Sequence, residues 1–222
     1  NGPAKAALML DPAAADTAQA LAPVEEQVRT TRNSLLVDGR KLAYGATAGT
    51  LTVRDTDGRP TASIFYTAYT LEGAGNVSRR PVIFLYNGGP GSASLQLHMG
   101  SFAPGRLRSP GPEPLEGPPY AFGPNPETLL ASTDLVFIDA PATGYSRALG
   151  AAKDSDFFSF DKDVTAFADA IMRYLTINDR WNAPKFLLGE SYGTARSAAL
   201  AYELQNRGVS VNGVVLLSSV LN

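Results

Sequence analysis

The chain has 222 residues, enough for one domain with a sizeable core, and its 19 basic and 21 acidic residues give a net charge of −2. Because the charges are spread without long runs of one sign, we expect neither a nucleic-acid partner nor binding to a membrane surface. No apolar stretch reaches the roughly 18 to 20 residues that span a bilayer. The chain has no cysteine and a single histidine, which excludes disulfides, thiolate metal sites and cysteine nucleophiles, so we expect no metal ion and no cofactor.

The start of the chain differs in character from the rest. Residues 1–33 are rich in alanine, proline and acids and lack strand alternation, which predicts an extended or partly helical leader without chemistry of its own. We expect residues 34–222 to form the second unit. This unit begins with short β-rich runs separated by Asp-Gly pairs at 38–39 and 57–58, and such pairs are typical of the turns of antiparallel hairpins.

The second half alternates between buried strands and helices. Continuous apolar runs predict strands buried on both faces of a parallel sheet at 81–89, 133–141, 185–189 and 213–219. Apolar residues at helical spacing predict one helix at 161–177, and a second is expected at 194–208, closed by Gly208. Residues 104–127 hold so many prolines and glycines that they predict a long surface loop rather than a helix or a central strand. The alternation predicts an α/β sheet.

The pattern G-x-S-x-G occurs once, as Gly-Glu-Ser-Tyr-Gly at 189–193. In this pattern the serine is a nucleophile on a sharp turn between a strand and a helix, and the small flanking residues let it protrude. The predicted strand before it and the predicted helix after it supply that context. An ordinary strand-to-helix turn with a capping serine is the alternative. The context favours Ser191 as a nucleophile that forms a covalent acyl intermediate.

A second glycine-rich stretch, YNGGPGSAS at 86–94, directly follows a predicted buried strand. A tetrahedral acyl intermediate needs backbone N–H donors near its negative oxygen, and paired glycines let the backbone come that close. One donor usually follows the nucleophile and the other lies in the loop after an earlier strand, so we expect the N–H groups of Tyr192 and Gly89 to form the pair. A phosphate-binding loop would need a lysine or glycine spacing that is absent here, whereas a plain turn stays open.

Three stretches in this order, NGGPGSASL at 87–95, DLVFIDAPATGYS at 134–146 and GESYGT at 189–194, together resemble the serine carboxypeptidase family of α/β-hydrolases. The resemblance runs from about residue 34 to the end of the sequence. It implies the N-terminal portion of an α/β-hydrolase fold, a mostly parallel central sheet with helices on both faces, without the lid insertion and the last strands. It also implies a peptide substrate that loses its C-terminal residue.

The resemblance carries over to further residues of the site. Asn87, the Gly88 N–H and Glu190 match positions that hydrogen-bond the terminal carboxylate of the substrate. An acid can bind a carboxylate only if one of the two is protonated, which a crowded site promotes by raising a pKa. Two plainer interpretations stay open: Asn87 could simply shape its turn, and Glu190 could be a solvated acid.

The sequence departs from the family pattern in the loop past the glycines. Ser101 stands where the family usually has a second acid, and Ser92 stands where it usually has a cysteine. The missing acid keeps an acyltransferase or esterase open as an alternative to a carboxypeptidase. Arg106 or Arg108 is a candidate substitute partner for the substrate carboxylate, although exposed arginines without such a role are common.

The acid and the base of a catalytic triad are expected outside this chain. In α/β-hydrolases the order is serine, acid, histidine, whereas Asp139 and the single histidine, His98, both precede Ser191. We therefore interpret Asp139 as structural and His98 as a packed residue. A C-terminal polypeptide of the same protein is expected to complete the fold and to supply the Asp and His.

Two expectations remain on activity and location. Without a base the serine hydroxyl is a poor nucleophile, so a non-catalytic binding domain is the alternative from another class. The Ala/Pro-rich leader favours an extracytoplasmic protein, either secreted or periplasmic, and the resemblance implies the same because the family is mostly extracytoplasmic.

Overall fold

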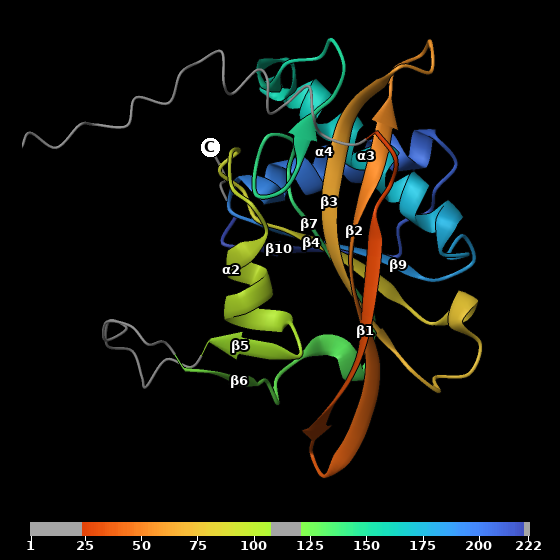
Figure 1. Ribbon diagram of the computed structural model, residues 1–222, viewed down its shortest axis with the longest axis vertical. Coiled ribbons are helices and arrows are strands. Elements are labelled where there is room, and N and C mark those ends of the chain that lie inside the picture. Colours follow the sequence, from red (N-terminus) through yellow and green to blue (C-terminus); the bar gives the residue numbers. More distant parts are fainter. Residues whose placement is uncertain (1–23, 108–120, 220–222) are drawn as a thin grey trace, which may run out of the picture.

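A mixed β-sheet flanked by helices forms the body of the protein, whose computed structural model describes residues 24–107 and 121–219 (Figure 1). The strands are β1 (Val28–Val37), β2 (Arg40–Arg54), β3 (Pro60–Leu71), β4 (Val82–Tyr86), β5 (Gly105–Leu107), β6 (Phe122–Pro124), β7 (Asp134–Ile138), β8 (Arg147–Ala148), β9 (Lys185–Glu190) and β10 (Gly213–Leu217). The main sheet has the order β1-β2-β3-β7-β4-β9-β10, with β8 paired to β3, and β5 and β6 form a separate pair.

The helices differ widely in length. They are η1 (Val77–Arg79), α2 (Leu95–Leu97), η2 (His98–Phe102), η3 (Leu129–Ala131), η4 (Asp154–Phe157), α3 (Phe160–Ile177) and α4 (Tyr192–Asn206). In the described ranges no helix is long and apolar enough to cross a membrane. The two long helices, α3 and α4, contact each other and lie next to the sheet, so they bring the segments after β7 and β9 together (Figure 1).

The antiparallel half of the sheet is built from two hairpins, as predicted. Asp38 and Gly39 join β1 to β2 with φ angles of 48° and 77°, the positive values that a tight two-residue hairpin requires. The pair at 57–58 lies in the turn between β2 and β3. β1 begins at Val28, inside the range predicted as leader. The sequence shows no sign of this strand because its first seven side chains are all exposed and show no alternation, although the backbone pairs with β2. Residues 1–23 lie outside the described residues.

The parallel half, β7-β4-β9-β10, holds the core and confirms the four predicted strands, but burial is confirmed for three of them and is wrong for β10, whose side chains are largely exposed. Side chains of a strand alternate between its two faces. On β4, Val82, Phe84 and Tyr86 join a cluster with residues of α3 and α4, whereas Ile83 and Leu85 join a second cluster with residues of α2 and η3. Both faces are therefore covered, which explains why the strand is apolar throughout.

The predicted helices are confirmed with small shifts of their ends. α3 starts after Ser159, whose hydroxyl accepts a hydrogen bond from the Lys162 N–H at 3.4 Å. α4 begins two residues earlier than predicted, directly after Ser191, and ends just before Gly208. Within 104–127 the described residues form no helix longer than one turn and no strand of the main sheet, as predicted, although the β5–β6 pair was not expected. Residues 108–120 lie outside the described residues.

A buried ion-pair cluster fastens the start of β7. The Asp134 carboxylate accepts hydrogen bonds from Arg180 Nη1 at 2.6 Å and from Arg80 Nε at 2.8 Å. Arg180 also donates to the Arg80 carbonyl at 2.7 Å. Because two arginines share one carboxylate, loss of either arginine leaves the buried charge paired.

The edge strand β10 is unusually apolar for its exposure. Val214, Val215, Leu216 and Leu217 are 38–51% exposed, and β10 pairs only with β9 in the described part of the chain. Side chains on both faces of the strand are thus uncovered. Proteins rarely leave such an apolar edge open, since it readily pairs with another strand.

His98 packs against the opposite face of the sheet from α3. Its Nε2 lies 2.7 Å from the Tyr69 hydroxyl, and its ring stacks on Phe137 with centroids 4.6 Å apart. Burial lowers the pKa of His98 to about 4, because the imidazolium would lose its water, and the Asp139 charge offsets this only in part. The interpretation as a packed residue is confirmed.

We expect the imidazole of His98 to titrate near pH 4, against about 6.5 in an unfolded chain. Between these values the unfolded chain binds a proton that the folded chain refuses, so stability falls as the pH is lowered from about 6.5 to about 4. His98 is the single histidine, so an NMR titration follows one imidazole signal without assignment. A midpoint at pH 6 or above in the folded protein would contradict the packing described here.

Candidate active site

Ser191 occupies a strained turn between β9 and α4. Its φ and ψ angles are 56° and −124°, a combination that costs a non-glycine residue about 1–3 kcal/mol. The Ser191 N–H donates to the Leu217 carbonyl at 2.9 Å, and its own carbonyl accepts from the Thr194 N–H at 2.9 Å. The turn is therefore held from β10 on one side and from the first turn of α4 on the other.

The glycines of the G-x-S-x-G pattern are required by close backbone approach. A Cβ at Gly189 would collide with the Gly193 carbonyl, and one at Gly193 would lie 3.1 Å from the Tyr86 carbonyl oxygen. Both distances are shorter than ordinary van der Waals contact. The sharp turn at Ser191 can form only because these positions carry no side chain.

The Ser191 side chain does not cap the helix. Ser191 stands at the N-cap position of α4, yet its hydroxyl makes no capping hydrogen bond. An ordinary capping serine accepts a bond from one of the first helical N–H groups. The capping interpretation is therefore wrong, and the half-buried hydroxyl is left free for another use.

The glycine-rich loop after β4 packs directly on this turn. A Cβ on Gly88 would lie 2.5 Å from the Tyr192 nitrogen and 2.7 Å from the Glu190 carbonyl oxygen. In the described residues, no backbone acceptor takes the N–H of Gly89 or of Tyr192. The two predicted oxyanion donors thus lie in adjoining segments with unused N–H groups, and the Tyr192 N–H stands at a helix N-terminus, where the dipole favours negative charge.

The residues predicted to bind a carboxylate also meet. Asn87 is 2% exposed, and its Nδ2 donates to Glu190 Oε2 at 3.1 Å while its Oδ1 accepts from the Leu97 N–H at 3.2 Å. Asn87 therefore does more than shape its own turn. Gln96 of α2 adds an amide oxygen 3.5 Å from Asn87 Nδ2, and no motif in the sequence pointed to it.

A buried arginine, Arg196, lies beneath the site and was also missed from the sequence. Arg196 forms two hydrogen bonds with the Asp163 carboxylate, at 2.7 and 3.2 Å, and donates to the Asn87 carbonyl at 2.8 Å. Its guanidinium carbon lies 5.3 Å from the centroid of the Tyr192 ring. Burial raises the pKa of Asp163, and the Arg196 charge opposes this. One visible signal was an arginine on the face of the predicted helix that turns toward the core.

Asp139 holds the loop after β7 in place rather than binding Ser191. Its Oδ1 accepts from the Ser94 N–H at 2.9 Å and from the Ser94 hydroxyl at 2.8 Å, and its Oδ2 accepts from the Tyr145 N–H at 3.3 Å. Within the described ranges, no hydrogen bond joins Asp139 or His98 to Ser191. The structural interpretation of Asp139 is confirmed, and the described chain offers Ser191 no base.

The candidate substitutes for the missing second acid gain little support. Arg106 pairs with Glu127 at 2.6 Å, so its guanidinium is already engaged, and Arg108 lies outside the described residues. Ser101 is half-buried in η2, where its carbonyl accepts from Asn125 Nδ2 at 2.7 Å. Ser92, in the place of the family's cysteine, is exposed.

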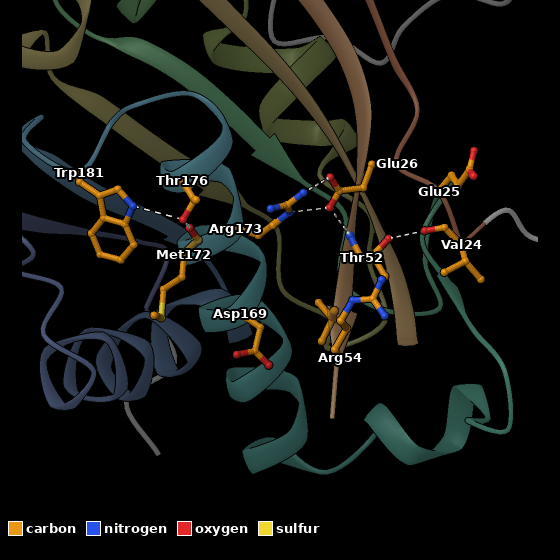
Figure 2. A pocket seen from close by; sticks show the side chains of 11 residues that line it. Val24, Glu25, Glu26, Thr52, Arg54, Asp169, Met172, Arg173, Thr176 and Trp181 are labelled. Atoms are coloured by element: carbon orange, nitrogen blue, oxygen red, sulfur yellow. Dashed lines mark hydrogen bonds and ion pairs between the residues drawn. The ribbon is translucent and has the colours of Figure 1, made fainter. Parts of the chain in front are cut away.

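A groove lies away from the candidate site residues. It has a volume of about 600 Å³ and lies between β2 and α3, where Glu26 and Arg173 form an ion pair at 2.7 Å (Figure 2). None of the candidate site residues lines it. Among the described residues, no group of three or more metal-ligating side chains is present.

Comparison with solved structures places this arrangement in a known fold. The prohormone-processing carboxypeptidase Kex1(delta)p from Saccharomyces cerevisiae matches with a TM-score of 0.61 and 21% identity, over 81% of this chain and 39% of that chain. The peroxisomal α/β-hydrolase Lpx1 from the same yeast gives a TM-score of 0.48 and 14% identity, over 89% and 45% of the two chains. The chain thus spans about two fifths of the length of the carboxypeptidase that it matches.

Comparison of the sequence agrees with the fold. No curated protein sequence matches the chain. The family model for serine carboxypeptidase, however, matches residues 40–218, which include the loop after β4, the loop after β7 and the turn at Ser191. The chain has an α/β-hydrolase fold and belongs to the serine carboxypeptidase family.

Proposed function

We propose that this chain is the N-terminal portion of a serine-type carboxypeptidase, which removes C-terminal residues from peptides through an acyl-enzyme on Ser191. One observation carries the proposal: the strained serine turn packs against a loop that presents Asn87 beside Glu190 at 3.1 Å. The pair stands next to the nucleophile, where the terminal carboxylate of a substrate would lie if the last peptide bond faced the serine.

The proposed reaction begins with attack of the Ser191 hydroxyl oxygen on the scissile carbonyl. The N–H groups of Gly89 and Tyr192 stabilise the resulting oxyanion, a contribution worth about 3–4 kcal/mol for each donor in other enzymes. Asn87, the Gly88 N–H and Glu190 hold the C-terminal carboxyl group, with one proton shared between the two carboxyl groups in the complex. The base, proposed to be a histidine of a completing polypeptide, takes the hydroxyl proton and passes it to the amine as the C–N bond breaks, so the C-terminal amino acid leaves. Water then hydrolyses the acyl-enzyme with the same base and frees Ser191.

The base must come from outside the described residues. We infer that a C-terminal polypeptide of the same protein pairs with β10, covers its apolar side chains and supplies the catalytic Asp and His. The open edge at Val214–Leu217 supports this, because a further strand would satisfy both the backbone and the apolar surface. We also propose that the protein is extracytoplasmic, either secreted or periplasmic, as is usual for the family.

An esterase or acyltransferase on the same scaffold is the second candidate. Ser101 in place of an acid favours it, because Glu190 then has no carboxylate partner with which to share a proton. A non-catalytic binding domain is the candidate of another class. Neither the strained turn nor the unused N–H donors would be needed by a protein that only binds.

A fluorophosphonate probe should label the complete protein on Ser191, because the probe reacts with an activated serine hydroxyl. The Ser191→Ala variant should lose labelling entirely, while Ser132→Ala, at an exposed serine of the loop before β7, should keep it. Mass spectrometry of the labelled peptide identifies the residue. An unlabelled Ser191 in the complete protein, beside a reactive control hydrolase, would favour the binding domain.

The carboxypeptidase proposal predicts release of a free amino acid from an N-blocked dipeptide. Gly88→Ala should lower kcat/KM by about a hundredfold or more, because its Cβ would press on backbone atoms that carry the oxyanion donors. Gly91→Ala in the same loop is the matched control, since its Cβ meets nothing within 4 Å. Hydrolysis of simple esters without any release of amino acid would instead support the esterase.

We expect the active protein to contain more than this chain of 222 residues. Intact-mass and peptide mass spectrometry of an active preparation should find a polypeptide that supplies an Asp and a His, either joined to this chain or bound to it after cleavage. A preparation that contains this chain alone and still hydrolyses peptides would refute the completing polypeptide.

A further inference from the structure

Arg196 connects the separate segments of the candidate site. It is fully buried on α4, and it contacts Asp163 of α3, the Asn87 carbonyl in the loop after β4 and the ring of Tyr192. A buried arginine of this kind is costly to desolvate, so its charge must be compensated. Asp163 supplies the compensation, and the remaining donor, Nη1, is directed at one backbone carbonyl of the site.

The contact with the Asn87 carbonyl fixes the direction of the next N–H group. The peptide bond between Asn87 and Gly88 is trans, because the one cis bond in the described residues joins Gly89 and Pro90. In a planar trans peptide the C=O and the following N–H point in opposite directions. With the carbonyl held by Arg196, the Gly88 N–H must point away from the Arg196 guanidinium.

The Asn87 side chain, a predicted carboxylate ligand, belongs to the same residue as the held carbonyl. The Asn87 side chain leaves the loop toward Glu190 and toward the start of α2, where it accepts from the Leu97 N–H at 3.2 Å. In the described residues, no backbone acceptor takes the Gly88 N–H. Arg196 thus fixes the orientation of an unused donor that directly follows Asn87 in the loop.

We propose that Arg196 is a positioning residue for recognition of the substrate's C-terminal carboxylate, and that it acts through the Asn87–Gly88 peptide. The inference rests on the proposed carboxypeptidase function and deepens it. A flexible loop could turn this peptide over and present a carbonyl oxygen, which repels a carboxylate. The Arg196 hydrogen bond at 2.8 Å, supported by Asp163, holds the orientation that attracts one.

The test compares two substrates of the complete protein: an N-blocked dipeptide with a free carboxylate, and the same dipeptide as its C-terminal amide. The main variant is the double change Arg196→Met with Asp163→Leu, which removes the anchor without leaving a buried charge. Arg196→Lys keeps a cation opposite Asp163 but offers a single ammonium in place of the guanidinium fork. Thermal unfolding verifies that each variant is folded.

The matched control is Arg180→Met. Arg180 is another buried arginine that binds an aspartate and a backbone carbonyl, at 2.6 and 2.7 Å, and Asp134 keeps Arg80 as a partner when Arg180 is lost. None of these groups contacts the loop after β4 that binds the carboxylate in the proposal. A loss of stability alone should therefore look alike in the two proteins.

We expect the double variant to lower the ratio of kcat/KM for the carboxylate substrate over the amide substrate by about tenfold, mainly through KM. The lost hydrogen bond orients a donor to the charged carboxylate, which the amide substrate lacks. Arg196→Lys should lie between it and the unchanged protein, and Arg180→Met should keep the original ratio. An equal fall for both substrates, or a fall of the ratio in Arg180→Met as well, would overturn the proposal. If the double variant does not fold, Arg196→Lys decides by the same ratio.

Failure of the proposed function looks different. A protein that hydrolyses neither substrate and takes no fluorophosphonate refutes the carboxypeptidase, and the inference falls with it. A protein that hydrolyses both substrates with the original ratio unaffected by the Arg196 variants keeps the function and refutes the positioning role alone.

Discussion

The candidate site depends on the contact between two backbone segments, the loop after β4 and the turn at Ser191. A Cβ on Gly88 would lie 2.5 Å from the Tyr192 nitrogen, and one on Gly193 would lie 3.1 Å from the Tyr86 carbonyl oxygen, so neither position leaves room for a side chain. Since β4 and β9 are adjacent parallel strands, their C-terminal ends meet at one edge of the sheet. The parallel pairing brings the two segments together, and the glycines let their backbones approach without side chains between them.

In the proposed reaction this contact decides which groups stabilise the negative charge. The proposed donors are backbone N–H groups rather than long side chains, and such donors are already oriented before a substrate arrives. Side chains contribute by holding the loop that carries these donors. Asn87 and Arg196 both fix the same short loop, one through its side-chain amide and the other through the Asn87 carbonyl, so two opposite faces of the loop are held at once.

Much of this could be predicted from the sequence, for physical reasons that also mark the limits. The Asp-Gly turn at 38–39 and the apolar run of β4 are local signals, since positive φ angles and burial on both faces leave few residue choices. β1 gave no such signal at Thr30 to Asn33, because an exposed edge strand is held by backbone bonds that any side chain permits. Arg196 matters through Asp163 and Asn87, 33 and 109 residues away along the chain, and Gln96 through a loop contact with Asn87, and no periodicity reveals either contact.

The exposed edge strand β10 supports the strained backbone of Ser191. Ser191 keeps its costly backbone conformation partly through the bond from its N–H to the Leu217 carbonyl, and Leu217 is the last residue of the open, apolar β10. An edge strand without an outer neighbour frays more readily than a paired one, so fraying of β10 would also loosen the turn at Ser191. In the proposed complete protein, a strand added beside β10 would therefore stabilise the position of the nucleophile as well as bring its base within reach.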